Sequence, residues 1–161
     1  MTTATDTRES LSAALKTSTA EAHDKAEHSV FMDDLLAGKL SVADFIALQE
    51  QSWLFYSALE DAARAVADHP LASEIVDPAL ERVNALEHDL NHLHGSTEWR
   101  TTVTPLPATV EYIARLNDIE ETKDVARLLA HHYVRYLGDL SGGQVIGRMM
   151  QRHYGVSDEC V

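Results

Sequence analysis

Apolar residues recur three or four positions apart through most of the chain, which is the spacing of one face of an α-helix. No segment alternates β-branched or aromatic residues with polar ones over the length of a strand, so the pattern predicts an all-α fold. A chain of 161 residues is long enough to bury one core. We therefore predict a single domain over residues 1–161, built as a compact helical bundle.

Six helical segments and their boundary signals follow from the sequence. The expected segments are Leu11–Ala26, Val30–Leu36, Ser41 to about Ala67, Pro78–His94, about Ala108–Asn117 and about Lys123–Tyr154. Capping residues begin two of them: Ser41, with a carboxylate three residues later, and Asp77, which precedes a proline. Glycines end two of them, at Gly38 and Gly95. Residues 96–107 are expected to form a loop.

The last predicted helix contains an unusual concentration of glycine. Four of the seven glycines lie within ten residues of it, at positions 138, 142, 143 and 147. Each glycine disfavours a helix interior by about 1 kcal/mol relative to alanine. Two explanations remain open: another helix packs closely against Gly138 and Gly142, or a flat ligand lies against bare backbone that can also kink. Asp139 slightly favours the ligand, because a carboxylate in an apolar helix is costly without a function.

His23 has more informative neighbours than the other eight histidines. Glu27 lies one helical turn later on the same face, and Lys16 lies two turns earlier, about 10.5 Å along the axis. If His23 bound iron at the centre of a porphyrin, Lys16 would lie near the edge of the ring. Glu27 could then accept a hydrogen bond from the second imidazole nitrogen. The alternative is a solvated helix with one histidine, which the spacing does not exclude.

Several segments together resemble the heme oxygenase family. They are Ala22–His28 (AHDKAEH) followed by Phe31-Met32, Gln49–Tyr56 (QEQSWLFY), the Ser96–Trp99 loop and Tyr133–Gln144 (YVRYLGDLSGGQ). The last of these segments is the most specific to the family. The resemblance extends over essentially the whole chain and is to the corynebacterial enzymes in particular.

This resemblance implies a reaction and a first set of ligand contacts. Heme, as both substrate and cofactor, would be opened to biliverdin, carbon monoxide and ferrous iron, using O2 and electrons from a reductase or ferredoxin. His23 would be the proximal ligand of the iron, with Glu27 as the partner of its second nitrogen. Lys16, Tyr133 and Arg135 would meet the heme propionates or line the pocket.

The resemblance also implies how the glycine-rich segment takes part. Gly138 and Gly142 would place bare backbone directly over the heme, on the side where oxygen binds. Asp139 would anchor ordered water that supplies protons, and Tyr56 and Arg135 would help to hold that water. A segment without acidic side chains facing the heme favours attack on the ring over early cleavage of the O–O bond.

Composition limits the remaining classes of partner. The formal net charge is −13, so binding to a nucleic-acid backbone is excluded on electrostatic grounds. No apolar run reaches the ~18 residues of a membrane span, and Met1–Ser10 lacks the apolar core of a secretory signal. Cys160 is the one cysteine, so an intrachain disulfide cannot form. We expect a cytoplasmic monomer with no membrane partner.

The chain departs from the family after Tyr154, where family members continue through further helices that complete the pocket. A heme-binding protein without turnover is therefore a second hypothesis, because an open pocket admits water. A ferritin-like di-iron bundle needs paired Glu-x-x-His motifs, and only Asp89-x-x-His92 comes near that pattern. A purely structural bundle would leave the glycine cluster unexplained.

Overall fold

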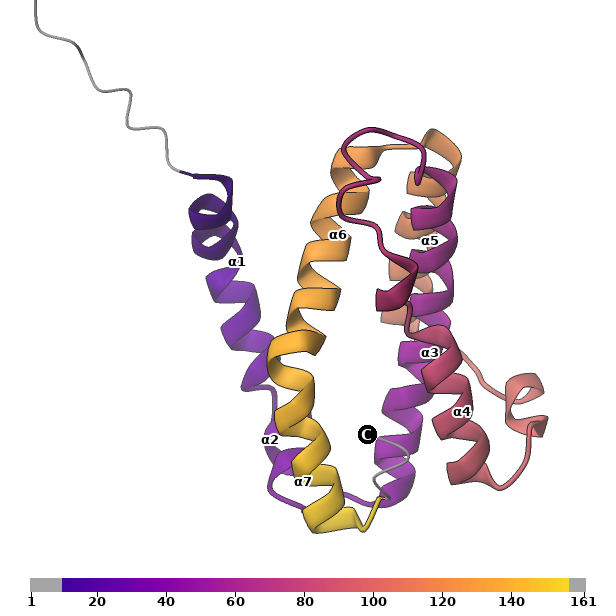
Figure 1. Ribbon diagram of the computed structural model, residues 1–161. Coiled ribbons are helices and arrows are strands. Elements are labelled where there is room, and N and C mark those ends of the chain that lie inside the picture. Colours follow the sequence, from indigo (N-terminus) through magenta and orange to yellow (C-terminus); the bar gives the residue numbers. More distant parts are fainter. Residues whose placement is uncertain (1–9, 157–161) are drawn as a thin grey trace, which may run out of the picture.

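The computed structural model describes residues 10–156, and every regular element in that range is helical (Figure 1). The elements are α1 (Leu11–Glu27), α2 (Val30–Leu36), α3 (Val42–Ala65), η1 (Pro78–Leu80), α4 (Val83–His94), η2 (Glu98–Thr101), α5 (Pro107–Thr122), α6 (Val125–Gly138), η3 (Asp139–Gly143) and α7 (Gln144–Tyr154). Elements η1 and η2 are 3₁₀ turns, and η3 is a π-helical turn. The all-α prediction is confirmed. None of the described helices is long and apolar enough to span a membrane.

The long helix α3 is the centre of the bundle, and α4, α5 and α6 pack around it (Figure 1). Its buried residues form the main core with residues of α4, α5 and α6; among the fully buried members are Leu59, Leu116, Ile119 and Leu128. A smaller apolar cluster joins α2, the start of α3 and α7 around Leu35, Phe45 and Met150. This second cluster fixes the end of α7 against the rest of the bundle.

The boundary signals acted locally as expected. Ser41 and Asp44 form a complete capping box, in which each side chain meets the backbone N–H of the other residue. Gly38 and Gly95 follow the ends of α2 and α4 with φ of 70° and 68°, a conformation that favours glycine. The ring of His153 packs directly on Gly38, and a Cβ at this position would lie only 2.7 Å from the ring. Short-range chemistry therefore set these boundaries.

The predicted helix from Pro78 to His94 is wrong in its first turn. Pro78–Leu80 forms only the 3₁₀ turn η1, and α4 begins at Val83 after a break in the chain direction. The physical reason is a buried carboxylate on α3: Glu60 accepts the backbone N–H groups of Arg82 and Val83, at 2.6 and 3.0 Å. A helix begins where its free N–H groups find acceptors, and here the acceptor comes from another helix.

Two other predicted boundaries need correction. Helix α5 continues to Thr122 and ends at Lys123, whose φ of 52° stops the helix, so the expected end near Asn117 came too early. The long last helix is interrupted by η3, where the chain widens into a π turn and α7 departs in a new direction (Figure 1). The expected loop 96–107 contains the turn η2.

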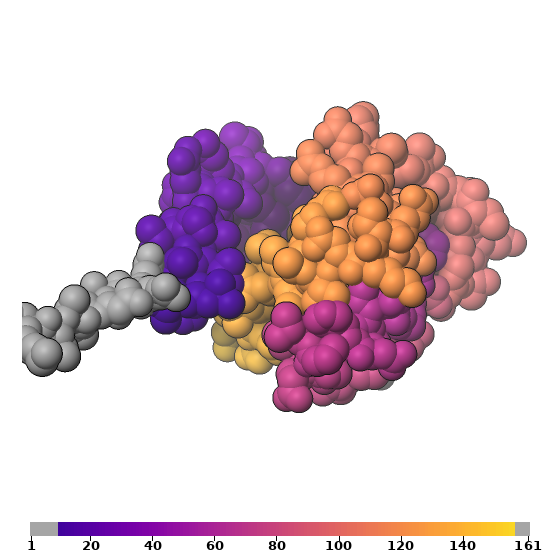
Figure 2. Space-filling model, turned by 90° about the horizontal axis from the view of Figure 1, so that it is seen from above, coloured from indigo at the N-terminus to yellow at the C-terminus, as the bar shows by residue number. Residues whose placement is uncertain are grey.

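Helix α1 stands at the side of the bundle and contributes no buried residue. It packs on α2, and a hollow separates it from α6 (Figure 2). Cys160 and the polar stretch 1–9 lie outside the described residues.

Candidate functional site

A groove runs between α1 and α6, where the sequence predicted a ligand between the first and last helices. It encloses about 370 Å³ and is lined by Lys16, Thr19, Ala20, His23, Asp24 and Tyr133. Three of the predicted residues, Lys16, His23 and Tyr133, therefore line one groove. Gly138 lies five residues beyond Tyr133, roughly 7.5 Å further along the same helix.

The two nitrogens of the His23 imidazole have different surroundings. Its Nδ1 lies 3.3 Å from a carboxylate oxygen of Glu27, one turn along α1. Its Nε2 has no protein partner within the described range, and the side chain is 71 % exposed. A carboxylate on one nitrogen orients the ring and leaves the other nitrogen free to bind a metal. This is the arrangement expected of an axial heme ligand.

Lys16 is a cation without a carboxylate partner among the described residues of a strongly acidic chain. Most basic side chains of α1 to α6 have a carboxylate within 4 Å, as in the pairs Lys25–Glu21 and Arg127–Asp118. Among residues 10–156, no carboxylate lies within that distance of Lys16. A free ammonium at the end of the groove can receive a ligand carboxylate, such as a heme propionate.

Three of the four glycines of the last predicted helix face open space, whereas Gly147 is buried in α7. A Cβ added at Gly138, Gly142 or Gly143 would meet no other heavy atom within 4 Å. Close packing of another helix against Gly138 and Gly142, one of the two explanations left open by the sequence, is therefore wrong. What remains is the second explanation: open backbone at Gly138 and Gly142, on the helix that forms one wall of the groove, as a flat ligand would need. The residues on both sides of the groove fit heme.

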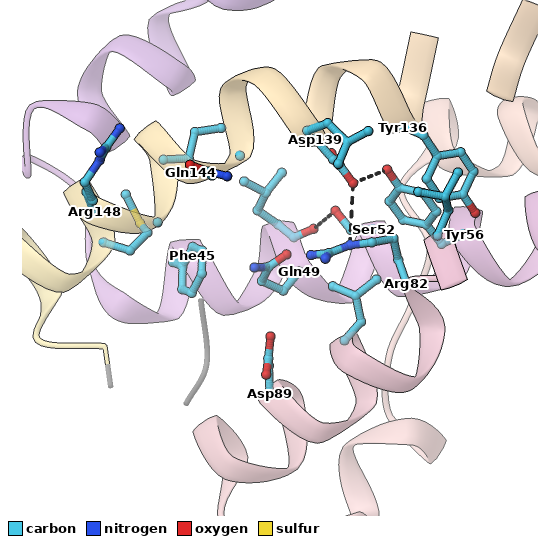
Figure 3. Close-up of a pocket in the computed structure, with 18 of the residues that line it drawn as sticks. Phe45, Gln49, Ser52, Tyr56, Arg82, Asp89, Tyr136, Asp139, Gln144 and Arg148 are labelled. Carbon is cyan, nitrogen blue, oxygen red and sulfur yellow. Dashed lines mark hydrogen bonds and ion pairs between the residues drawn. The ribbon is translucent and has the colours of Figure 1, made fainter. Parts of the chain in front are cut away.

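Asp139 sits behind this glycine-rich surface, at the start of η3, and is held by side chains of two other elements (Figure 3). The Tyr56 hydroxyl of α3 donates a hydrogen bond of 2.6 Å to its Oδ2, and Arg82 Nε lies 3.6 Å from the same oxygen. The Oδ1 atom has no hydrogen-bond partner among the residues that the structure describes. It can therefore accept a hydrogen bond from water.

Tyr56 is fixed as a donor in this arrangement. Its side chain is buried, and burial together with the Asp139 carboxylate raises the pKa of the phenol far above its ordinary value. The hydroxyl therefore keeps its proton at physiological pH. Asp139 remains the acceptor of the pair.

A second cavity, of about 720 Å³, lies between α3, the start of α4 and the η3–α7 segment (Figure 3). Its polar lining includes Gln49, Ser52, Tyr56, Arg82, Asp89, Asp139, Gln144 and Arg148. Apolar residues of both core clusters, such as Phe45 and Leu86, complete the wall. The Asp139 carboxylate thus borders a cavity of mixed polar and apolar lining, with room for ordered water.

Arg135 does not reach the groove between α1 and α6. Its guanidinium lies over the rings of Phe55 and Tyr112, 4.2 and 4.9 Å from their centroids, and Nε donates to the Tyr112 hydroxyl at 3.4 Å. From there its charge opposes the rise in the pKa of Tyr56. The structure thus places Arg135 beside the Tyr56–Asp139 pair and away from Lys16.

The sequence did not reveal Arg82 or Glu60. Arg82 appeared to lie within a continuous helix, and nothing near it in sequence marks it as a partner of Asp139. Glu60 occupies a buried position of α3, and the adjacent Asp61, which is exposed, hid any signal that a buried carboxylate would have given in the sequence. A di-iron site is not supported, because no group of three or more metal-binding side chains occurs among residues 10–156.

Comparison with known proteins decides the family. The model of the family described as heme oxygenase matches residues 9–161. The chain belongs to the heme oxygenase family. Heme oxygenase 1 of Gallus gallus is 38 % identical over 143 residues, which cover 88 % of this chain and 48 % of that protein. The heme oxygenase of Porphyra purpurea is 35 % identical over 93 % of this chain and 63 % of its own length.

Solved structures of heme oxygenases share the fold. Heme oxygenase-1 of Synechocystis, in complex with heme, superposes with a TM-score of 0.81 at 34 % identity, covering 90 % of this chain and 65 % of that one. The heme oxygenase of Leptospira interrogans gives a TM-score of 0.85 at 33 % identity, covering 93 % and 72 %. This chain spans about half to two thirds of the length of the curated relatives that it matches.

Proposed function

We propose that this chain binds heme in the groove between α1 and the α6–η3 segment and opens it to biliverdin, carbon monoxide and ferrous iron. One observation supports this above the others: His23, with a free Nε2, lines the groove opposite Tyr133 of α6, and five residues beyond Tyr133 the same helix enters a stretch whose glycines face open space. The two faces of a porphyrin need these two environments, a ligand on one side and room for a small molecule on the other.

In this proposal each groove residue has a distinct task. His23 would bind the heme iron, and Glu27 would orient the His23 ring. Lys16 and Tyr133 bind the propionates at the end of the groove. Bound heme supplies the iron that activates O2, with electrons from a separate reductase or ferredoxin. The glycine backbone excludes side-chain acids from that side of the ring.

Protons would come from water held by Asp139. Because Tyr56 and Arg82 both engage Oδ2, Oδ1 can accept a hydrogen bond from water in the adjoining cavity. Tyr56 keeps its proton, so it fixes the carboxylate without competing for the transferred proton.

A hemin titration tests the binding step. We expect a Soret band typical of histidine-ligated heme, and His23→Ala should abolish it. His28→Ala is a matched control, since His28 lies on the same helix end but does not line the groove. Absence of the band in the native protein, or its survival in His23→Ala, would contradict the proposal.

A second candidate function is heme binding without turnover, since the chain spans only part of its relatives. Reductant and oxygen, supplied to the heme complex, separate the two functions. Formation of biliverdin and of the ferrous carbon monoxide complex supports the enzyme, whereas stable bound heme supports the second candidate. The corynebacterial subtype, the cytoplasmic location and the monomeric state remain predictions from the sequence.

A further inference from the structure

The start of α4 is capped in an unusual way. Arg82 occupies its N-cap position and provides no side-chain cap. Ser, Thr, Asn or Asp at that position would cap the helix locally. Instead, Glu60 of α3 accepts the N–H groups of Arg82 and Val83, at 2.6 and 3.0 Å, with a side chain that is only 3 % exposed. Burying a carboxylate is costly, so a local cap would be the simpler way to begin this helix.

The side chain at the N-cap position is used elsewhere. From this position Arg82 reaches across the second cavity, and its Nε lies 3.6 Å from Asp139 Oδ2 (Figure 3). The backbone of Arg82 is thus fixed by Glu60 while its guanidinium contacts the carboxylate that the proposed reaction needs. Other charged groups near Glu60 are Arg64 and Glu81, which pair with each other at 2.7 Å.

We propose that Glu60 is a positioning residue: by holding the backbone of Arg82, it places the guanidinium against Asp139. Asp139 Oδ2 then keeps two partners, Tyr56 and Arg82, and Oδ1 stays directed to water. The inference rests on the proposed function for its catalytic meaning, but its structural content holds for the protein without heme. It assigns a task to a buried carboxylate 22 residues away from Arg82 in sequence.

Two variants of Glu60 separate the effect of its side-chain length from the effect of its charge. Glu60→Asp keeps the charge but shortens the side chain by one methylene, so the carboxylate no longer reaches both N–H groups. Glu60→Gln keeps the length and an acceptor oxygen but removes the charge. Asp61→Asn is the matched control, because Asp61 also pairs with Arg64 yet does not contact Arg82.

The readout is hydrogen exchange of the Arg82 Nε–H, measured by NMR on the ligand-free protein. Asp139→Asn gives the reference for a lost ion pair, which we expect to speed exchange roughly three- to five-fold, as for a partly exposed pair. Glu60→Asp should speed exchange by the same factor, whereas Glu60→Gln and Asp61→Asn should match the native protein.

A native exchange rate of the Arg82 Nε–H in a folded Glu60→Asp variant would overturn the inference. Faster exchange in Glu60→Gln alone would also overturn it, because the charge of Glu60 and not the length of its side chain would then matter. If Glu60→Asp does not fold, Glu60→Gln decides: native exchange supports the inference and fast exchange overturns it. Because no heme is present, a failure of the proposed function would leave this result unaffected.

Discussion

The hydroxyl of Tyr56 donates a hydrogen bond of 2.6 Å to Asp139, a residue 83 positions away. The bond links the central helix α3 to the π turn η3 between α6 and α7. It orients the Asp139 carboxylate within the glycine-rich segment and leaves one carboxylate oxygen for water. The geometry of the proposed reaction depends on this link.

Removing the Tyr56 hydroxyl should therefore weaken the fold as well as the site. We expect Tyr56→Phe to lower the free energy of unfolding by about 1.5–3 kcal/mol, since a hydrogen bond to a charged acceptor is lost. Tyr136→Phe is the control, because the Tyr136 hydroxyl makes no hydrogen bond to a described residue. Chemical denaturation measures both, and equal losses in the two variants would contradict the assigned role.

Asp139→Ala should separate binding from turnover. The carboxylate does not line the groove between α1 and α6, so hemin affinity and the Soret band should stay within about threefold of native, a difference below 1 kcal/mol. The rate of biliverdin formation should fall by about a hundredfold or more, the lower end of what a positioned proton source contributes. An unchanged rate would refute the water-anchoring role.

Gly138→Ala tests why the glycines are present. Its backbone is helical, with φ of −60° and ψ of −48°, and the added methyl group meets nothing within 4 Å. The ligand-free protein should therefore gain up to about 1 kcal/mol of stability, while hemin affinity falls. Gly38→Ala is the contrasting variant: its positive φ and its contact with His153 predict lower stability. A destabilised Gly138→Ala would revive the packing explanation.

In the proposed heme complex, Glu27→Gln should change the bond between His23 and iron without removing it. A neutral amide accepts a weaker hydrogen bond from the imidazole N–H than a carboxylate does, which makes the imidazole a weaker ligand. The iron–imidazole stretching frequency of the ferrous complex should therefore decrease, and hemin affinity should fall by about tenfold. Resonance Raman spectroscopy measures the first effect. Glu21→Gln, which breaks only the exposed pair with Lys25, should leave both at their native values.

Stability should decrease in mildly acidic solution because of two histidines of α6. Burial lowers the pKa of His132, and burial together with Arg127, Arg135 and Arg115 lowers that of His131. Below about pH 6.5 these two histidines bind protons in the unfolded chain but stay neutral in the folded chain. The free energy of unfolding therefore falls as the pH falls.

Each histidine contributes a slope of at most about 1.4 kcal/mol per pH unit. His132→Gln should reduce the slope measured between pH 7 and 5. An identical slope in His132→Gln and in the native protein would show that His132 is protonated in the folded state.

Interactions between residues close in sequence allowed much of the fold to be predicted. Helical periodicity, the Ser41 capping box and the glycines at 38 and 95 act within a few residues, so the sequence determined most helices and several of their ends. The same holds for His23 and Glu27, one turn apart on one helix, whose contact follows from helix geometry alone.

Contacts between distant segments were decided only by the tertiary structure. The break before α4 depends on Glu60, the pairing of Arg82 with Asp139 depends on that break, and the open space around Gly138 depends on where α1 stands. None of these follows from spacing along the chain, because each joins groups whose distance is set by helix packing. The sequence by itself determined the helices and most of the candidate residues; packing decided which of them meet.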